Sequence, residues 1–276
     1  MPLFDLHTHS TASDGTLSPE GLVSRAKERG VDTLALTDHD TVAGIGIALQ
    51  ASKSLGLHLV PGIELSSQWK GLGIHILGLN IDHTHPAMTR AQTQQRETRE
   101  ERAVLIDTRL QKIGVSGALA GARALAGDAV LGRPHFAQYL INVGYVNSMN
   151  LAFKQYLGAG KAGDIKHLWP EMATVIEWIR MAGGVAVLAH PSKYKLTNAK
   201  LRRLIGDFSD MGGQGIEVIS GSQESQITQN LTRIANDFDL CASCGSDFHG
   251  PGAPWHELGA FDNLPTSCQP IWQLWH

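Results

Sequence analysis

The stretch "DTLALTDHD", residues 32–40, is an apolar run of strand length that ends in two aspartates around a histidine. A helix is predicted on each side of it. Upstream, Ser18 supplies an N-cap and Gly30 ends the helical segment. Downstream, residues 41–55 have the pattern of a second helix. The local unit therefore alternates strands with helices, and polar side chains follow the strand.

The same arrangement recurs along the chain. Further apolar runs of strand length are "LHLVPGIEL" at 57–65, "GIHILGL" at 73–79, "GGVAVLAH" at 183–190, "GIEVIS" at 215–220 and "LCASCGSD" at 240–247. Strands that are apolar on both faces and alternate with helices are typical of a parallel sheet. Together with the opening strand they predict an α/β protein with about seven strands, arranged most simply as a barrel.

Residues 84–168 interrupt this rhythm with a long, polar, arginine-rich helix pattern and several shorter helical segments. We interpret them as a helical insertion that forms part of the substrate pocket. Residues 1–83 and 169–276 then make up the barrel. Within the insertion, the charged run 96–102 is predicted to be a solvated helix face.

Composition limits the classes of partner. The chain of 276 residues has a formal net charge of −3 and an estimated pI of 6.5, so no global positive field attracts long DNA or an anionic membrane. No apolar run is long enough to span a bilayer, and residues 1–15 do not resemble a secretory signal. The three cysteines are too few for a disulfide framework and predict a cytoplasmic location.

Potential metal ligands follow the predicted strands. His7 and His9 project from the same side of the opening strand, because side chains alternate between faces. A single histidine of this kind is often an ordinary core residue, but the placement recurs at six strand ends. The nine candidate ligands are His7, His9, Asp14, His39, Glu64, His75, His190, Asp247 and His249.

Six imidazoles and three carboxylates exceed what one ion needs. The set suits two or three divalent metal ions, with carboxylates able to bridge them. The absence of thiolates disfavours a structural zinc site. Mixed nitrogen and oxygen ligation suits manganese, iron or catalytic zinc and does not choose among them. We expect Mn²⁺, with Zn²⁺, Fe²⁺ and Mg²⁺ as alternatives.

Several ordered motifs carry a resemblance to a known family. They are "DLHTHSTASDGTLSP", "LALTDHDTVAG", "PGIELSS", "HILGLNID", "GRPHFAQYLINVGYV", "GGVAVLAHPSKY", "GIEVIS" and "CGSDFHG". The chain resembles the polymerase and histidinol phosphatase (PHP) family. More closely, it resembles its bacterial branch of nucleoside 3',5'-bisphosphate phosphatases that also trim short RNAs from the 5' end. This resemblance implies a distorted seven-stranded (β/α)7 barrel with a trinuclear metal site.

The resemblance also implies how the ligands are shared. The first metal would be held by His7, His9, Glu64 and Asp247. The second would share Glu64 and take His75 and His190. The third would take Asp14, His39 and His249. In that arrangement Glu64 is catalytic because it links two ions, and Asp14, His39 or a metal-bound water would protonate the leaving hydroxyl.

A second anion-binding group is predicted after the insertion. In "GRPH", Arg133 offers a forked donor and His135 an imidazole to a substrate phosphate, as the resemblance also suggests. The alternative is a plain helix start with a solvated arginine. Ser222 and Asn80 are weaker substrate-binding candidates, expected on the same rim.

The predicted function is metal-dependent removal of the 3'-phosphate from a nucleoside 3',5'-bisphosphate, such as adenosine 3',5'-bisphosphate, which leaves the nucleoside 5'-monophosphate. The enzymatic alternatives are a phosphatase for another metabolite, such as histidinol phosphate, and a 5'-3' exonuclease on short oligoribonucleotides. The non-enzymatic alternative is a metal- or nucleotide-sensing module. The complete ligand set and the absence of any linker or low-complexity tail count against it.

Overall fold

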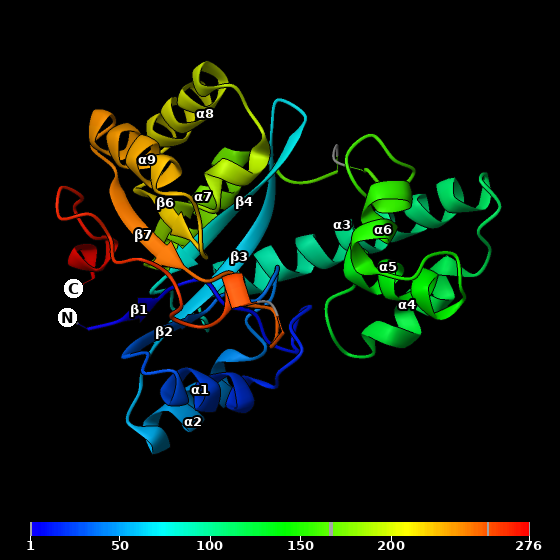
Figure 1. Cartoon of the computed structure of the whole chain (residues 1–276), viewed down its shortest axis with the longest axis horizontal. Helices are drawn as coiled ribbons and strands as arrows, with labels where there is room; N and C mark the ends of the chain where they lie inside the picture. Colours follow the sequence, from blue (N-terminus) through cyan, green and yellow to red (C-terminus); the bar gives the residue numbers. More distant parts are fainter. Residues whose placement is uncertain (1, 166–167, 253, 276) are drawn as a thin grey trace.

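A computed structural model describes residues 2–165, 168–252 and 254–275. Its sheet has the strand order β1 to β7. The strands are β1 Phe4–Asp5, β2 Thr33–Leu36, β3 His58–Trp69, β4 Leu72–Leu79, β5 Val185–Leu188, β6 Gly215–Ser220 and β7 Cys241–Gly245. A backbone hydrogen bond of 3.0 Å from Leu6 N to Cys244 O joins the two edge strands. The sheet is thus a nearly closed, distorted α/β barrel, as the sequence predicts (Figure 1).

Helices cover the outside of the barrel. They are α1 Pro19–Glu28, α2 Ile45–Leu55, α7 Met172–Met181, α8 Asn198–Asp210 and α9 Ser225–Asp237. The first begins where predicted, because the Ser18 hydroxyl accepts a hydrogen bond of 3.1 Å from Gly21 N. Alternate strand residues face inward, so a cluster that includes Leu6, Ala35 and Val187 fills the barrel.

The strand β4 runs against its neighbours, which corrects the expectation of a wholly parallel sheet. It pairs antiparallel with both β3 and β5. Only Lys70 and Gly71 connect β3 to β4, and both have positive φ angles of 50° and 77°. A two-residue connection makes a hairpin, whereas a parallel crossover needs a dozen residues or more.

The direction of β4 decides where its flanking residues lie. His75 pairs with Ser66 near the carboxyl end of β3, so it stays at the predicted rim. Leu79 pairs with Val185 at the start of β5. Asn80 therefore lies at the opposite end of the barrel, and its predicted place on the ligand-bearing rim is wrong.

Most of the segment between β4 and β5, up to the start of α7, forms a helical lobe beside the barrel (Figure 1). It contains α3 Pro86–Gln111, α4 Ala118–Ala126, α5 Arg133–Asn142, α6 Met149–Ala152 and a short π-helix, Phe153–Leu157. The lobe has its own hydrophobic cluster, which takes in Ile106 and Leu110 from the far end of α3. Met88 and Ala91, near the start of α3, belong to a cluster of the barrel instead. Because α3 enters both clusters, the division at residues 84–168 stays a prediction.

The described residues contain no helix that is both long enough and apolar enough to cross a membrane.

Candidate metal centre and the adjoining arginine pocket

The structure brings all nine predicted ligands together at one rim of the barrel. His7 and His9 follow β1, His39 follows β2, and His190 follows β5. Two parallel bridges, between Thr8 and Phe248 and between His39 and Glu64, hold these strand ends in contact. The geometry thus gathers side chains from six strands and one loop.

Glu64 is the centre of this cluster, because its buried carboxylate faces five imidazoles. Its oxygens lie 2.8–3.3 Å from their ring nitrogens. The five are His7, His9, His39, His75 and His190. One carboxylate in contact with so many nitrogen ligands is suited to bridging two ions.

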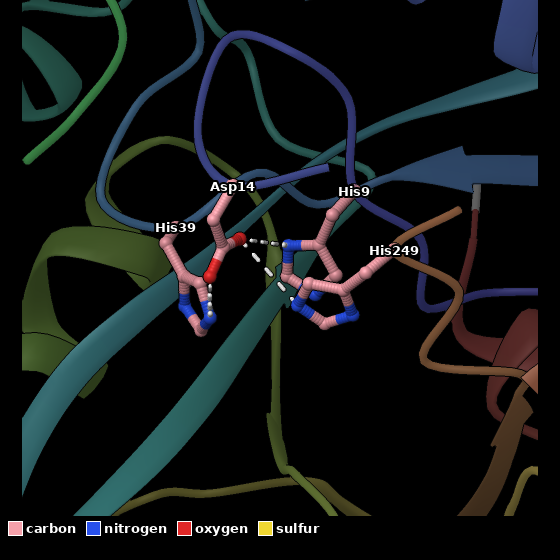
Figure 2. Close-up of side chains that lie close together, drawn as sticks. All are labelled: His9, Asp14, His39 and His249. Atoms are coloured by element: carbon pink, nitrogen blue, oxygen red, sulfur yellow. Dashed lines mark ion pairs between the residues drawn. The ribbon is translucent and has the colours of Figure 1, made fainter. Parts of the chain in front are cut away.

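Asp14 is the centre of a second group (Figure 2). Its carboxylate oxygens lie 3.9 Å from His9 Nδ1, 3.9 Å from His39 Nε2 and 3.4 Å from His249 Nε2. One ligand atom from each of these four residues lies within 4.8 Å of all the others, a spacing that could hold a metal ion. His9 and His39 also face Glu64, so the two groups adjoin.

Asp247 completes the rim. Its Oδ1 lies 3.5 Å from His7 Nε2 and 3.4 Å from His9 Nε2. Its other oxygen is paired with Lys193, a residue that the sequence analysis did not assign. Asp247 and His190 have positive φ angles of 55° and 30°, so the backbone is strained where it presents both side chains.

Unpartnered atoms show that these residues fit a metal. His7 Nε2, both ring nitrogens of His9, His39 Nδ1 and Glu64 Oε2 are buried without a hydrogen-bond partner. Burying polar atoms without partners is costly, and divalent cations supply partners to such atoms. Mixed imidazole and carboxylate ligands suit Mn²⁺, Fe²⁺ or catalytic Zn²⁺ and do not decide among them.

The electrostatics of the cluster depend on opposite charges packed together. Burial alone would raise the pKa of Glu64, but His39, His7 and His75 outweigh it and hold that pKa well below its usual value. Burial and the charge of His249 lower the pKa of His9 to about 3. An imidazole that stays neutral is ready to act as a ligand.

A cavity of about 200 Å³ opens beside the cluster. Asp14, His39 and His75 line its barrel side. The opposite wall comes from the helical lobe and the segment that follows it, and it contains Arg99, Arg102, Arg133, Phe153, Asp164 and Trp169. A negatively charged molecule in this cavity would therefore touch the predicted ligands on one side and guanidinium groups on the other.

Two of these arginines correct the expectation of a solvated helix face at 96–102. Arg99 is only 8% exposed and Arg102 only 6%. Arg102 Nε donates to Ile165 O at 2.8 Å, and its guanidinium lies 5.1 Å from the ring of Trp169. The expectation fails at these two positions because the lobe folds back over the site, whereas Arg96, Glu97 and Glu101 of the same run are exposed to water as predicted.

Burial and neighbouring positive charges together outweigh the attraction of Asp164 and Asp40 for Arg102. Burial, together with the charges of Arg133 and Arg99, lowers the pKa of Arg102 to about 9. Burial also lowers the pKa of Arg133, whose Nη1 donates to Leu157 O at 3.3 Å. Arg99 is already neutralised by Asp40. An anion between Arg102 and Arg133 would relieve their repulsion.

The other predicted substrate-binding residues, His135, Ser222 and Asn80, do not line this cavity. His135 Nδ1 accepts a hydrogen bond of 3.0 Å from Gly132 N, so that nitrogen caps α5. Ser222 lines a separate cavity of about 370 Å³ with Gly259 and Asp262. Asn80 lies at the far end of the barrel. Arg133 alone of the four lines the cavity beside the metal centre.

Sequence reasoning also missed Glu217, which lies in β6 and contacts His7 and His190. The available signal was a glutamate in the middle of the apolar strand "GIEVIS". The burial of Arg102 was harder to predict from the sequence, because buried and exposed arginines occur in the same polar pattern along a helix.

Comparisons with known proteins agree with this geometry. A 5'-3' exoribonuclease from Haemophilus influenzae is 48% identical over 98% of both chains. A 3',5'-nucleoside bisphosphate phosphatase from Chromobacterium violaceum is 40% identical over 99% of this chain and 96% of its own. Among solved structures, an amidohydrolase from Chromobacterium violaceum with bound sulfate matches with a TM-score of 0.90 at 40% identity, covering 98% of this chain and 94% of that one.

The family model for the PHP domain matches residues 5–219. That range contains seven of the nine clustered side chains, from His7 to His190. Asp247 and His249 lie beyond it but contact the same cluster through His7 and Asp14. With its fold, its rim of imidazoles and carboxylates and these relatives, the chain belongs to the PHP domain family.

Proposed function

We propose that this protein is a metal-dependent phosphatase that removes the 3'-phosphate of nucleoside 3',5'-bisphosphates and releases the nucleoside 5'-monophosphate. One observation carries the proposal. The buried Glu64 cluster opens into a cavity whose opposite wall presents the guanidinium groups of the buried Arg102 and the half-buried Arg133. A small molecule with two phosphates matches these two opposed sites.

The ligand sets implied by the PHP resemblance fit the observed contacts. His7, His9, Glu64 and Asp247 would hold the first ion. Glu64, His75 and His190 would hold the second, and Asp14, His39 and His249 the third. We propose Mn²⁺, with Zn²⁺, Fe²⁺ and Mg²⁺ as alternatives. Bound ions of this kind stabilise the charge of a transferring phosphoryl group and lower the pKa of water.

The residues of the chain have separate tasks in this proposal. Glu64 holds five imidazoles in place, so it keeps the ligands of two ions in one geometry. Asp14 and His39 line the cavity and can pass a proton to the departing 3' oxygen. Arg133, with Arg102, grips the 5'-phosphate by charge-assisted hydrogen bonds.

A second activity follows from the same bond. Cleavage between the 3' oxygen and phosphorus releases a 5'-monophosphate from a bisphosphate, and it also releases one from the 5' end of RNA. The similarity to a 5'-3' exoribonuclease favours this second activity. So does a cavity of about 610 Å³ that shares Arg99 with the smaller one and also contains Arg96 and Arg123. We propose short oligoribonucleotides as the second substrate class.

Phosphate release by the manganese-loaded protein tests the main proposal. Adenosine 3',5'-bisphosphate is compared with 3'-AMP, 5'-AMP and histidinol phosphate. We expect selective release from the bisphosphate, with 5'-AMP as the product. Equal rates on all four would refute a two-phosphate site, and release from histidinol phosphate alone would identify another metabolite phosphatase. No release from any of them, or from short RNA, would favour the sensing module.

The second activity is tested with a 5'-phosphorylated RNA trinucleotide and its 5'-hydroxyl form. We expect 5'-monophosphates to be released from the phosphorylated form, because the arginine pair needs a 5'-phosphate. Equal cleavage of both forms would contradict that role. The three described cysteines are free and buried, which supports a cytoplasmic location as part of the proposal.

A further inference from the structure

Glu217 is a charged side chain where the fold would normally place an apolar one. It lies between Ile216 and Val218 in β6, and it is completely buried. It is not among the nine residues proposed to hold metal. A buried carboxylate is retained at such a position only with good hydrogen-bond partners.

The two oxygens of Glu217 contact residues that follow two different strands. Oε1 lies 2.9 Å from His7 Nδ1, beyond the end of β1. Oε2 accepts a hydrogen bond from the backbone N–H of His190, beyond the end of β5. Both partners are proposed metal ligands. The carboxylate of Glu217 therefore contacts the ring of His7 at the nitrogen that faces away from the cluster, and it contacts the backbone of His190.

The contact with His7 has a direct consequence for its ring. A carboxylate can only accept, so His7 Nδ1 must carry the proton. In the neutral ring, which is the form that binds metal, the lone pair is then on Nε2, and Nε2 points at Glu64 Oε2 (3.2 Å) and Asp247 Oδ1 (3.5 Å). Carboxylate partners of this kind fix the tautomer and orientation of metal-binding histidines.

The contact with His190 acts on the backbone. His190 has φ 30° and ψ 56°, a left-handed conformation that costs energy for a residue with a side chain. In this conformation its Nε2 lies 3.0 Å from Glu64 Oε1. The bond from His190 N to Glu217 helps to hold the turn that aims the ring at the cluster.

We propose that Glu217 is a positioning residue for the metal centre, which sets the tautomer of His7 and holds the turn at His190 so that both rings present Nε2 to metal. This inference rests on the proposed metal-dependent function. It assigns Glu217 no contact with the substrate.

The chemistry of the side chain predicts which substitution is informative. In Glu217→Gln the size is kept, but only one acceptor oxygen remains for two donors. If that oxygen serves His190 N, the amide NH₂ faces His7 Nδ1 and drives the proton to Nε2, which then cannot bind metal. If that oxygen accepts from His7 Nδ1, the amide NH₂ lies against the N–H of His190. Two donors then face each other, and the turn at His190 is weakened.

The experiment measures Mn²⁺ binding to the chelated full-length protein by titration calorimetry, together with its thermal unfolding without metal. We expect Glu217→Gln to lower the affinity for Mn²⁺ by about 10–100-fold. Its metal-free melting temperature should fall by a few degrees while the protein stays folded, because one of the two buried donors loses its acceptor. Activity should recover in part at high Mn²⁺ concentration.

Ser243→Ala is the matched control. Ser243 pairs with Glu217 across β6 and β7, and its buried hydroxyl has no hydrogen-bond partner. It therefore perturbs the same part of the barrel without touching a proposed ligand, and Mn²⁺ affinity should not change. Wild-type affinity in Glu217→Gln, or an affinity loss that Ser243→Ala shares, would overturn the proposal.

A second measurement does not require any variant to fold. Nitrogen-15 NMR of the wild-type protein loaded with diamagnetic Zn²⁺ reports which nitrogen of His7 carries the proton. A proton on Nδ1 supports the proposal, and a proton on Nε2 overturns it. Metal binding with the expected tautomer but no phosphate release would refute the proposed function and leave the role of Glu217 standing.

Discussion

The barrel rim and the arginine wall of the helical lobe face each other across one cavity, yet they are built in different ways. The rim collects one or two side chains from the end of each of several strands. The wall takes Arg99 and Arg102 from a single helix and Arg133 from the start of another. The rim is fixed by closure of the sheet, whereas the wall depends on how the lobe lies over it.

This difference separates two kinds of task. Side chains at the rim contact one another through opposite charges, so each is held by several neighbours. In the wall, Arg102 and Arg133 donate to backbone carbonyls and line the cavity, whereas Arg99 is paired with Asp40. The rim is therefore suited to chemistry and the wall to recognition.

The largest effect is expected at the centre of the rim. Glu64→Gln removes the charge that faces five imidazoles, so turnover should fall on the order of a thousandfold or more, with loss of bound metal. Steady-state phosphate release and elemental analysis measure the two effects. Glu177→Gln, on the exposed face of α7, is the control. Retained activity in Glu64→Gln would contradict the assignment.

Removal of the metal should weaken the rim without unfolding the barrel. Metal held at 100–1,000 times its dissociation constant contributes about 3–4 kcal/mol of stability. In its absence, imidazole–carboxylate contacts and the pair of Lys193 with Asp247 still balance the buried charges. We therefore expect chelation to lower the melting temperature by roughly 5–15 °C with an unchanged circular dichroism spectrum. A chelated protein without helical signal would show that folding requires metal.

The arginine wall should affect recognition selectively. Arg133→Ala removes a charge-assisted hydrogen bond worth about 1.5–3 kcal/mol, so KM for adenosine 3',5'-bisphosphate should rise by roughly 10–100-fold. For 3'-AMP, which lacks the 5'-phosphate, KM should stay the same. Arg233→Ala, which removes an exposed arginine of α9, serves as control. An equal rise for both substrates would exclude Arg133 as the 5'-phosphate grip.

The smallest effect is expected at the far end of β4. Asn80→Gly suits the positive φ of 55° at that position and should change kcat/KM by less than about twofold. His75→Ala, five residues earlier on the same strand, should lower kcat/KM by at least about tenfold because His75 contacts Glu64. The two variants are compared by initial rates. A large loss in Asn80→Gly would mean that the ends of β4 are assigned the wrong way round.

Many of the side chains at the rim could be predicted, because their positions follow from the local alternation of apolar runs and polar residues in the sequence. An apolar run of strand length ends at a definite residue, and the polar groups after it share one edge of a parallel barrel. That reasoning located His39 and His190 from their own segments alone. It failed at Asn80, because it assumed a parallel strand although the seven residues between the predicted strands, 66–72, are too few for a parallel crossover.

Glu217 and Arg102 show where local pattern stops being informative. A glutamate inside an apolar strand signals a buried partner, but the partners, His7 and His190, lie 210 and 27 residues away. The arginines of α3 have the pattern of a solvated helix. Only the packing of the lobe against the barrel buries Arg99 and Arg102 and leaves the other arginines of α3 exposed.

The sequence by itself determined the α/β barrel, the family and the set of side chains available for metal, since strand periodicity and strand ends are local properties of the chain. The tertiary structure decided the direction of β4, the burial of Arg102 and the outer contacts of His7. These depend on which surfaces meet, and surfaces meet through contacts between residues far apart in the chain.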